Sequence, residues 1–416
     1  RELIARFRIA SDPEIATIEK EREHLRRQVE ERRRLAPLTL YTRALEQPRP
    51  VRILPRGDWL DQSGELVDPA VPAFLGTLQR RHADRTRADR LDLANWMVRP
   101  AREGGVGELT ARVFVNRIWA MLMGSGLCPS LEDFGGQGRP PTHPELLDHL
   151  ALDFIESGWS IKALVRRIVS SDSYARSSRP VGQTAMLDPD NLFHARQSRH
   201  RLAAEFVRDA ALHAGGLLQQ RQGGPSIKPP QPEGHYRHLN FPPRRYEADT
   251  DADQWRRGVY VHWQRQFLHP MLKAFDAPTR EACTASRTVS NTPLAALVLL
   301  NDPVFLQAAR GLARRVLTTP VPGSSEDPDE FRLVTAWRIT LGRTPAPGEL
   351  TVLEKLLTRS RAEFSAAPER AEALLGIGVS EPGPLERNQR LPAPEFAAWT
   401  QTCRAILNLH ETYTRE

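Results

Sequence analysis

Residues 109–151 have the sequence LTARVFVNRIWAMLMGSGLCPSLEDFGGQGRPPTHPELLDHLA, and this stretch decides the fold class. Its first part repeats apolar side chains at intervals of three and four, which is typical of a helix with one buried stripe. These side chains are Ala111, Val115, Ile118, Trp119 and Leu122. A second stripe begins at Leu147. Two such helices joined by a glycine- and proline-rich loop predict a helical bundle.

The loop over residues 133–145 contains a predicted helix start. Thr142 is expected to cap the helix, and Glu145, three residues later, to return the hydrogen bond of a capping box. Asp133 and the two residues after it match the magnesium-binding tripeptide of protein kinases, but no other kinase motif is present. The chain also has no P-loop, GxSxG elbow or HExxH helix. The familiar nucleotide-binding and hydrolase classes are therefore not indicated.

Similar periodicity on both sides of this loop predicts a mainly α-helical, bundle-like composite module with long irregular Pro/Gly-rich loops and a small strand element. The predicted parts are a charged helical connector from an upstream module (1–50), a first helical subdomain (51–180), a second (181–320) with a long loop (218–257) and a strand near 258–263, and C-terminal helices that pack on the body (321–416). A loop of that length is expected either to serve a function or to wrap the surface as an arm.

Composition excludes several partner and cofactor classes. The net charge of +7 is small for 416 residues and both signs are interleaved, so no nucleic-acid partner is predicted. The three cysteines form neither a CxxC nor a CxxCH motif, and no cofactor is predicted for this chain. No stretch approaches the roughly 20 apolar residues of a membrane span. Because the chain opens at Arg1 in a helical pattern, we expect it to be part of a longer protein.

Charged and polar side chains on predicted helices and loops are the candidate ligand-binding residues. The predicted helix with Arg201, Glu205, Arg208 and Asp209 carries both charge signs on one face. If that face meets the Asp133 loop, a polar cleft forms between them. Ion-pair networks that join helices would satisfy the same groups without a ligand. The candidates are Asn116, Arg139, Arg201, Glu205, Arg208, Asp209, Arg257, Asp276 and Arg287.

The candidate catalytic residues are Asp133, His143 and Glu145, facing Arg117, because a histidine and carboxylates can transfer protons. His143 near a helix start also has a purely structural interpretation, as a capping residue.

The long loop carries histidines and aromatic residues. His235 and His238 are weak metal candidates with generic spacing, so no metal site is predicted. Tyr236, Phe241, Tyr246 and Trp255 offer flat contacts for a polysaccharide or a partner subunit, or else pin the arm to the core.

Several segments, in order along nearly the whole chain, resemble one known family. The clearest are RLDLANWMV at 90–98, ARVFVNRIW at 111–119, residues 126–151, RLAAEFVRDA at 201–210, RRGVY at 256–260, NTPLAALVLLNDPVF at 291–305 and WRITLGRTPAPGEL at 337–350. They are similar to the C-terminal domain of planctomycete surface proteins called domain of unknown function fifteen-fifty-three, the module that accompanies planctomycete cytochrome c domains.

The resemblance implies an extracytoplasmic protein, periplasmic or at the cell surface, whose partners include the upstream modules of the same polypeptide. Haem would belong only to an upstream cytochrome c module. We therefore expect a binding or interaction module for a polysaccharide or a protein. The alternative is an enzyme, a hydrolase or an oxidoreductase coupled to the cytochrome c module, with a polar cleft around Asp133 and His143. A structural spacer without a ligand is the third possibility.

Overall fold

The computed structural model describes residues 12–35, 41–43, 45, 47–82, 87–239, 243–265, 267–323, 327–378 and 391–415. These residues are mainly helical and contain two small two-stranded sheets, which confirms the predicted fold class. The chain divides into two compact units. The first comprises residues 1–66 and 222–225, and the second comprises residues 67–221 and 226–416.

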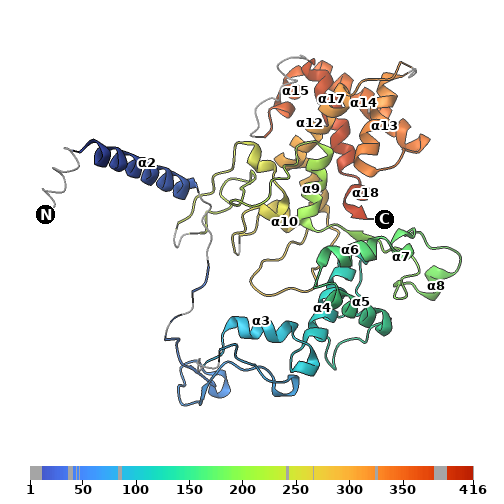
Figure 1. The fold of residues 1–416 in the computed structure, drawn as a ribbon. Helices are drawn as coiled ribbons and strands as arrows, with labels where there is room; N and C mark the ends of the chain where they lie inside the picture. The colour runs from blue at the N-terminus through green and yellow to red at the C-terminus, as the bar shows by residue number, and fades with distance from the viewer. Residues whose placement is uncertain are drawn as a thin grey trace. The chain divides into compact units, whose positions relative to one another are not determined.

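The described part of the first unit contains one long charged helix, α2 (Pro13–Leu35) (Figure 1). Intrahelical ion pairs lie along it, including Arg22 to Glu19 at 3.0 Å. The chain continues through β1 (Val51–Arg52) and η1 (Pro55–Gly57), and the boundary of the unit falls within β2 (Leu66–Val67).

The second unit begins with a small bundle that has its own core (Figure 1). Its elements are η2 (Ala73–Leu75), α3 (Arg90–Val98), η3 (Ala101–Glu103), α4 (Gly107–Met123), α5 (Pro144–Glu156), α6 (Ile161–Val169), α7 (Asp172–Ala175) and α8 (Thr184–Leu187). Val115 on α4, Leu147 on α5 and Leu164 on α6 are buried together in this core. The apolar stripes of the sequence are therefore the faces that meet.

The start of α5 differs from the predicted capping box. His143 is the N-cap residue, and Pro144 occupies the first helical position. Thr142 instead faces the preceding loop, where its backbone N–H donates to the Leu127 carbonyl oxygen at 2.8 Å and its hydroxyl donates to the same oxygen at 3.2 Å. The prediction that Thr142 and Glu145 cap the helix is wrong, because the helix starts one residue later than the sequence pattern suggested.

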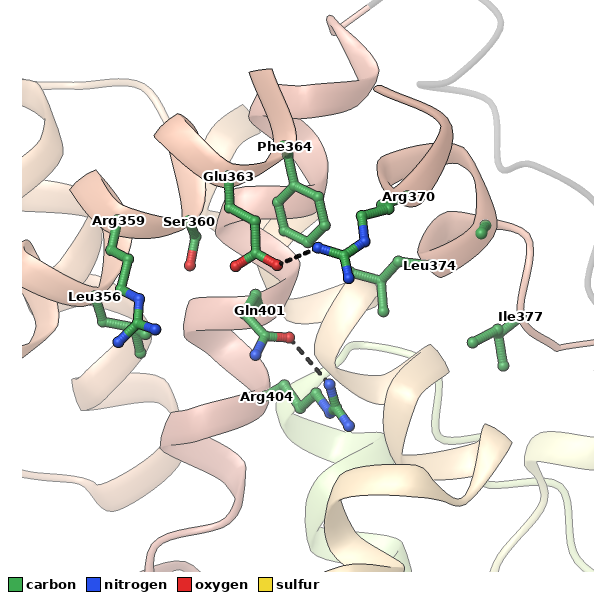
Figure 2. A pocket seen from close by; sticks show the side chains of 11 residues that line it. Leu356, Arg359, Ser360, Glu363, Phe364, Arg370, Leu374, Ile377, Gln401 and Arg404 are labelled. Atoms are coloured by element: carbon green, nitrogen blue, oxygen red, sulfur yellow. Dashed lines mark hydrogen bonds and ion pairs between the residues drawn. The ribbon is translucent and has the colours of Figure 1, made fainter. Parts of the chain in front are cut away.

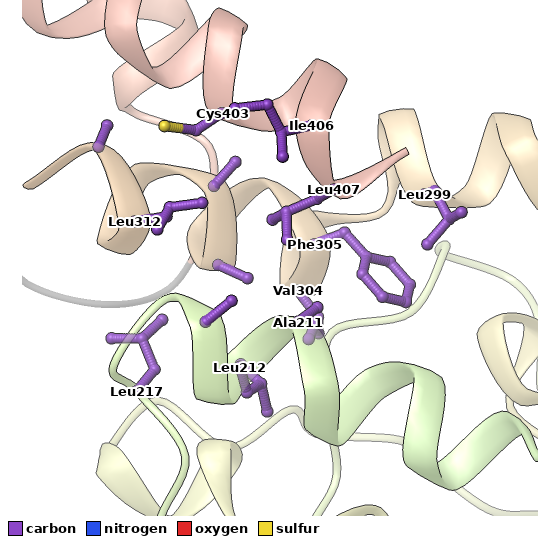
Figure 3. Packing of buried hydrophobic residues seen from close by; sticks show 14 of the residues in the cluster. Ala211, Leu212, Leu217, Leu299, Val304, Phe305, Leu312, Cys403, Ile406 and Leu407 are labelled. Atoms are coloured by element: carbon purple, nitrogen blue, oxygen red, sulfur yellow. The ribbon is translucent and has the colours of Figure 1, made fainter. Parts of the chain in front are cut away.

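A larger core lies in the remaining helices of the second unit. Its elements are β3 (His200–Arg201), α9 (Ala204–Ala214), η4 (Ala252–Trp255), η5 (Gly258–Tyr260), α10 (Pro270–Ala274), α11 (Pro293–Asn301), α12 (Pro303–Thr318), α13 (Pro328–Leu341), α14 (Pro347–Ala366), α15 (Pro368–Leu375), α17 (Ala393–Leu407), α18 (His410–Tyr413) and β4 (Thr414–Arg415). Figure 3 shows Leu212, Phe305 and Ile406, from α9, α12 and α17, among the residues of this core.

Close contact between α9 and α12 depends on glycine. A Cβ atom placed on Gly215, which follows α9, would lie 2.6 Å from the Ala308 carbonyl oxygen on α12. No larger residue fits there without displacing the helix. The two helices can therefore approach closely enough to bury Leu212 completely.

The C-terminus returns to the start of α9. β4 pairs antiparallel with β3, with His200 opposite Arg415 and Arg201 opposite Thr414. The Arg415 guanidinium also donates to the Leu122 carbonyl oxygen of α4 at 3.3 Å. This short sheet thus links the two cores of the second unit.

The predicted strand near residues 258–263 is wrong. Residues 258–260 form the 3-10 helix η5, and Val261 makes only an isolated parallel bridge with Ile227. Packing against α9 explains the difference. A Cβ atom on Gly258 would lie 2.8 Å from the Glu205 carbonyl oxygen, and its N–H donates to Asp209 Oδ1 at 2.6 Å. This backbone is therefore bound to a helix side chain instead of to a strand.

Candidate functional site

The candidate site residues lie in two separate clusters of the second unit. The first occupies α4, the loop after it and the start of α5, and the second surrounds α9. Among the described residues, no hydrogen bond or ion pair joins a candidate of one cluster to a candidate of the other. The first cluster comprises Asn116, Arg117, Asp133, Arg139, His143 and Glu145, and the second comprises Arg201, Glu205, Arg208, Asp209, Arg257, Asp276 and Arg287.

Most polar groups of the first cluster shape its loop. The fully buried Asn116 side chain donates to the Cys128 carbonyl oxygen and accepts from the Cys128 N–H, both at 2.8 Å. Asp133 Oδ1 accepts the Gly135 N–H at 2.7 Å, which closes a tight turn. The Arg139 N–H donates to Ser130 Oγ at 2.8 Å, while the Arg139 side chain is exposed. Asn116 and Asp133 therefore act through backbone hydrogen bonds.

His143 packs in an aromatic environment. Its Nδ1 lies 3.0 Å from the Thr142 hydroxyl, and its ring centroid lies 6.0 Å from that of His194 and 6.2 Å from that of Phe193. Burial and the nearby charge of His143 lower the pKa of His194 to about 4. His194 Nε2 accepts a hydrogen bond from the Trp119 indole N–H at 3.4 Å, as a neutral ring can.

The four candidate catalytic residues are not connected. Arg117 and Glu145 are exposed. In the described part of the chain, no hydrogen bond or ion pair joins any two of Arg117, Asp133, His143 and Glu145. The arrangement therefore provides a histidine and carboxylates on one loop, without the contacts that align a proton-transfer pair.

The second cluster is built on α9, whose Arg208 side chain has no solvent exposure. Its guanidinium donates from Nη1 to the Arg256 carbonyl oxygen at 2.6 Å and from Nη2 to the Gln254 carbonyl oxygen. Burial lowers its pKa to about 10, although Asp209 and Asp302 favour the charged form. Arg208 therefore anchors residues 254–256 to the helix.

Other polar groups near Arg208 are bound to the protein itself. His269, which caps α10, accepts the Met271 N–H through Nδ1 at 3.3 Å and donates from Nε2 to the Pro230 carbonyl oxygen at 3.1 Å. Burial lowers its pKa to about 4, so the ring is neutral at pH 7. The Tyr246 hydroxyl donates to the Pro229 carbonyl oxygen at 2.5 Å, and burial raises its pKa. The described hydrogen bonds of Arg208, His269 and Tyr246 therefore go to the protein itself, and Arg208 Nε is the buried atom of this group that has no partner among the described residues.

Two arginines from other segments contact the outer face of α9. Arg287 donates to both carboxylate oxygens of Glu205, at 2.7 and 3.2 Å, and Arg257 Nε lies 3.8 Å from Asp209 Oδ2. Glu205 and Asp209 are four residues apart and so share one helix face. Burial raises the pKa of Asp209 despite its hydrogen bond from Gly258 and the two neighbouring arginine charges.

Both outer arginines remain open to solvent, and exposed apolar residues lie close in the sequence to these arginines or to the residues that they contact. The side chains of Arg287 and Arg257 are 40% and 46% exposed. Phe206 follows Glu205, Val259 follows Gly258, and Val289 is two residues beyond Arg287, and all three are exposed. We call the set of Phe206, Arg257, Val259, Arg287 and Val289 the arginine surface.

Arg201 and Asp276 hold the loop that carries Arg287. Arg201 Nη2 donates to Asp276 Oδ2 and its Nη1 to the Ser290 carbonyl oxygen, both at 2.6 Å. The Ser290 N–H and hydroxyl donate to the Asp276 carboxylate at 2.8 Å each. Although burial opposes ionisation, these bonds lower the pKa of Asp276. The loop between Asp276 and Ser290 is therefore fixed at both ends.

Of the two candidate histidines of the long loop, His235 contacts the backbone outside the loop, whereas the described contact of His238 is with its neighbour Arg237. His235 Nε2 lies 3.3 Å from the Leu268 carbonyl oxygen, and His238 Nε2 lies 3.5 Å from Arg237 Nη2. Over the ranges that the structure describes, no three His, Cys, Asp or Glu side chains gather where they could hold a metal ion.

The aromatic side chains favour the interpretation that they pin the arm. The Tyr236 and Tyr246 rings pack edge to face at 5.2 Å, and Trp255 Nε1 donates to Gln307 Oε1 of α12 at 3.1 Å. Phe241, the fourth aromatic residue of this group, lies outside the described residues.

Sequence reasoning missed the exposed part of the arginine surface. Phe206 fits the apolar spacing of α9 but is 52% exposed. Its neighbour Glu205, whose side chain binds Arg287, occupies the more covered position. The available signal was the placement of Val289 outside any predicted helix or strand, where an apolar side chain has no stripe to join.

Comparison with known proteins identifies a family and no individual relative. Residues 89–357 match the family model described as PSD1, protein of unknown function (DUF1553). Neither the curated proteins nor the solved structures gave a match. Within its described portion, the chain has no helix with the length and apolar character needed to cross a membrane.

Proposed function

We propose a binding function for this chain, which belongs to the PSD1 (DUF1553) family of proteins of unknown function. Its arginine surface would recognise an acidic polysaccharide. One observation carries the proposal: Arg257 and Arg287 lie side by side on the two carboxylates of one helix face and yet keep nearly half of each side chain exposed.

The chemistry of the arginine surface suits a polymer that bears carboxylates. An arginine has five N–H donors, and Arg287 uses two of them on Glu205. The remaining donors can bind a carboxylate in a bidentate manner. Glu205 and Asp209 hold the guanidinium groups in place before the ligand arrives, which lowers the entropy cost of binding. The exposed Phe206 ring offers an apolar face for a sugar ring.

We further propose that the module works outside the cytoplasm in a longer polypeptide, downstream of a cytochrome c module that holds the haem. The supporting observation is the ordered resemblance of its segments to the planctomycete surface-protein domain. Cell fractionation of the native full-length protein tests this assignment, and recovery in the cytoplasm contradicts it.

The enzyme alternative has less support than binding. A hydrolase, or an oxidoreductase coupled to the cytochrome c module, would need Asp133, His143, Glu145 and Arg117 to act together. Within the described ranges these side chains share no hydrogen bond or ion pair, so we base the proposed function on the second cluster alone.

The test compares polygalacturonate with neutral dextran in a binding assay and on a glycan array. The double variant Arg257→Gln/Arg287→Gln should lose at least about tenfold in affinity for the acidic polymer, because each charge-assisted bond contributes roughly 1.5–3 kcal/mol. The matched control is Arg139→Gln, which removes an exposed arginine of the first cluster. Thermal unfolding confirms that both variants are folded.

Three results would contradict the proposal. The first is a lack of binding to any acidic glycan. The second is equal binding of the acidic and the neutral polymer. The third is an equal loss in the control variant, which would indicate a nonspecific charge effect.

A further inference from the structure

A pocket of about 610 Å³ lies between α14, α15 and α17, and no candidate residue of either cluster lines it (Figure 2). Its volume is within the range of about 300–1,000 Å³ that is usual for small-molecule sites. Most of the residues that line it follow residue 357, where the family match ends. The lining includes Leu356, Arg359, Ser360, Phe364, Leu374 and Arg404.

The pocket combines an apolar wall with an excess of positive charge. Leu356, Phe364 and Leu374 supply the wall. Three arginines and one glutamate line the pocket, so its formal charge is 3 − 1 = +2. The glutamate, Glu363, is already paired with Arg370 at 3.1 Å.

Arg404 is held rigidly by neutral groups. Its Nε donates to the Leu300 carbonyl oxygen at 2.6 Å, its Nη1 to Gln401 Oε1 at 3.0 Å, and its Nη2 to Asn301 Oδ1 at 3.2 Å. Burial lowers its pKa. None of its contacts within the described residues is a carboxylate, so its charge is not neutralised by the protein. Arg359, at the other end of the pocket, forms no ion pair in the same ranges.

Ser360 presents its hydroxyl to this pocket. The residue is only 4% exposed, and Figure 2 shows its oxygen directed toward the space between α14 and α17. A helical hydroxyl commonly bonds to the carbonyl four residues earlier, as Thr358 does to Glu354 at 2.9 Å. Ser360 makes no such bond to any described residue. Its oxygen is therefore available to bond to a ligand atom in the pocket.

We propose that this pocket binds a small organic anion in which a carboxylate is attached to an apolar body. The carboxylate accepts hydrogen bonds from the Ser360 hydroxyl and from Arg359 or Arg404, the two lining arginines that have no ion pair within the described residues. The apolar body packs on Phe364 and Leu374. The site is independent of the arginine surface and of the polysaccharide function proposed above.

Isothermal titration with two probes and their neutral analogues tests this site. Octanoate represents a free fatty acid, and N-acetylphenylalanine represents the C-terminal carboxylate of a peptide. Octanol and N-acetylphenylalanine amide lack the charge. Binding of at least one anion with a Kd below about 1 mM, together with at least tenfold weaker binding of its neutral analogue, supports the site, and the anion that binds identifies the source.

Substitutions of the lining residues test whether the anion binds in this pocket. Arg359→Gln and Ser360→Ala should each weaken the anion about fivefold or more, and Ser360→Leu should abolish binding by filling the pocket. Lys355→Gln is the matched control, because Lys355 is exposed on the same helix but does not line the pocket. The proposal is overturned if neither anion binds, if charged and neutral probes bind equally, or if the pocket variants behave like Lys355→Gln.

Discussion

Arg208, which has no solvent exposure, donates a hydrogen bond from Nη1 to the backbone carbonyl oxygen of Arg256 at 2.6 Å. A side chain of α9 thereby fixes the backbone immediately before Arg257, one of the two arginines of the arginine surface. Since a second Arg208 donor binds the Gln254 carbonyl oxygen, the helix fixes the chain at two backbone positions around the end of η4. The position of the arginine surface therefore depends on Arg208, a buried residue that is not part of that surface.

Arg208→Met should destabilise the protein strongly. Methionine fills similar space but leaves the two carbonyl oxygens of residues 254 and 256 buried without their donors. We expect a loss of roughly 3 kcal/mol in the free energy of unfolding, measured by urea denaturation. Arg117→Met, at an exposed position of α4, should change it by less than about 0.5 kcal/mol. Equal stability of the two variants would disprove the anchoring role.

Gly258→Ala should also destabilise the protein, through a steric clash. The added Cβ would lie 2.8 Å from the Glu205 carbonyl oxygen and 2.9 Å from Glu205 Cα, so the loop must shift from the helix. The expected cost is about 1–3 kcal/mol. Gly348→Ala is the control, because it lies within α14 with open space around it and should stabilise that helix by up to about 1 kcal/mol. The two substitutions should thus have opposite signs in thermal unfolding.

The three cysteines should differ in their reactivity. All are free, with Cys283 exposed and Cys128 and Cys403 buried. Burial also raises the pKa of Cys403, which disfavours the reactive thiolate. A thiol reagent should therefore modify one cysteine in the native protein and all three in denaturant. In Cys283→Ser the native reaction should disappear, and rapid native labelling of a second cysteine would contradict the burial of the other two.

Much of the fold follows from local sequence patterns. The stripes of α4 and α5 predict their buried faces because helical periodicity is a property of the segment itself. The start of α5 is one residue off because Thr142 has an alternative partner, the Leu127 carbonyl oxygen, that lies fifteen residues away in the sequence. Residues 258–260 have the composition of a strand but form η5, because Gly258 binds Asp209 of α9. Tertiary contacts of this kind leave no local signal.

The residues of the candidate site could be predicted from the sequence, but the contacts between them could not. The charges of α9 were recognised as candidates, and the structure pairs Glu205 with Arg287 and Arg201 with Asp276 across more than seventy residues. The sequence alone gives no means of matching such partners. The charged lining of the α14–α17 pocket was missed for a related reason, since Arg359 and Arg404 belong to separate helices and no local pattern in the sequence brings them together.

Asp302→Asn should remove part of the pH dependence of stability. Asp302 caps α12 by accepting the Val304 N–H at 2.9 Å, and burial raises its pKa to about 6, against the opposing effects of that bond and of Arg208. Its pKa in the folded state is above the unfolded value of 3.8, so the folded protein binds more protons between about pH 4 and pH 6. The stability that this group contributes is therefore lost as the pH rises through about 6.

Asparagine also caps helices, so the variant keeps the cap and removes the charge. Relative to the wild type, it should gain up to roughly 3 kcal/mol between about pH 4 and about pH 7.5 in urea denaturation. Asp276→Asn is the control of opposite sign, because the pKa of Asp276 is lowered and its contribution is already present above pH 4. That variant should be destabilised throughout this pH range. The contrary outcome is a constant difference in the free energy of unfolding between the wild type and Asp302→Asn across the range. It would show that Asp302 is ionised in the folded protein and that its environment is more hydrated than the contacts around Arg208 suggest.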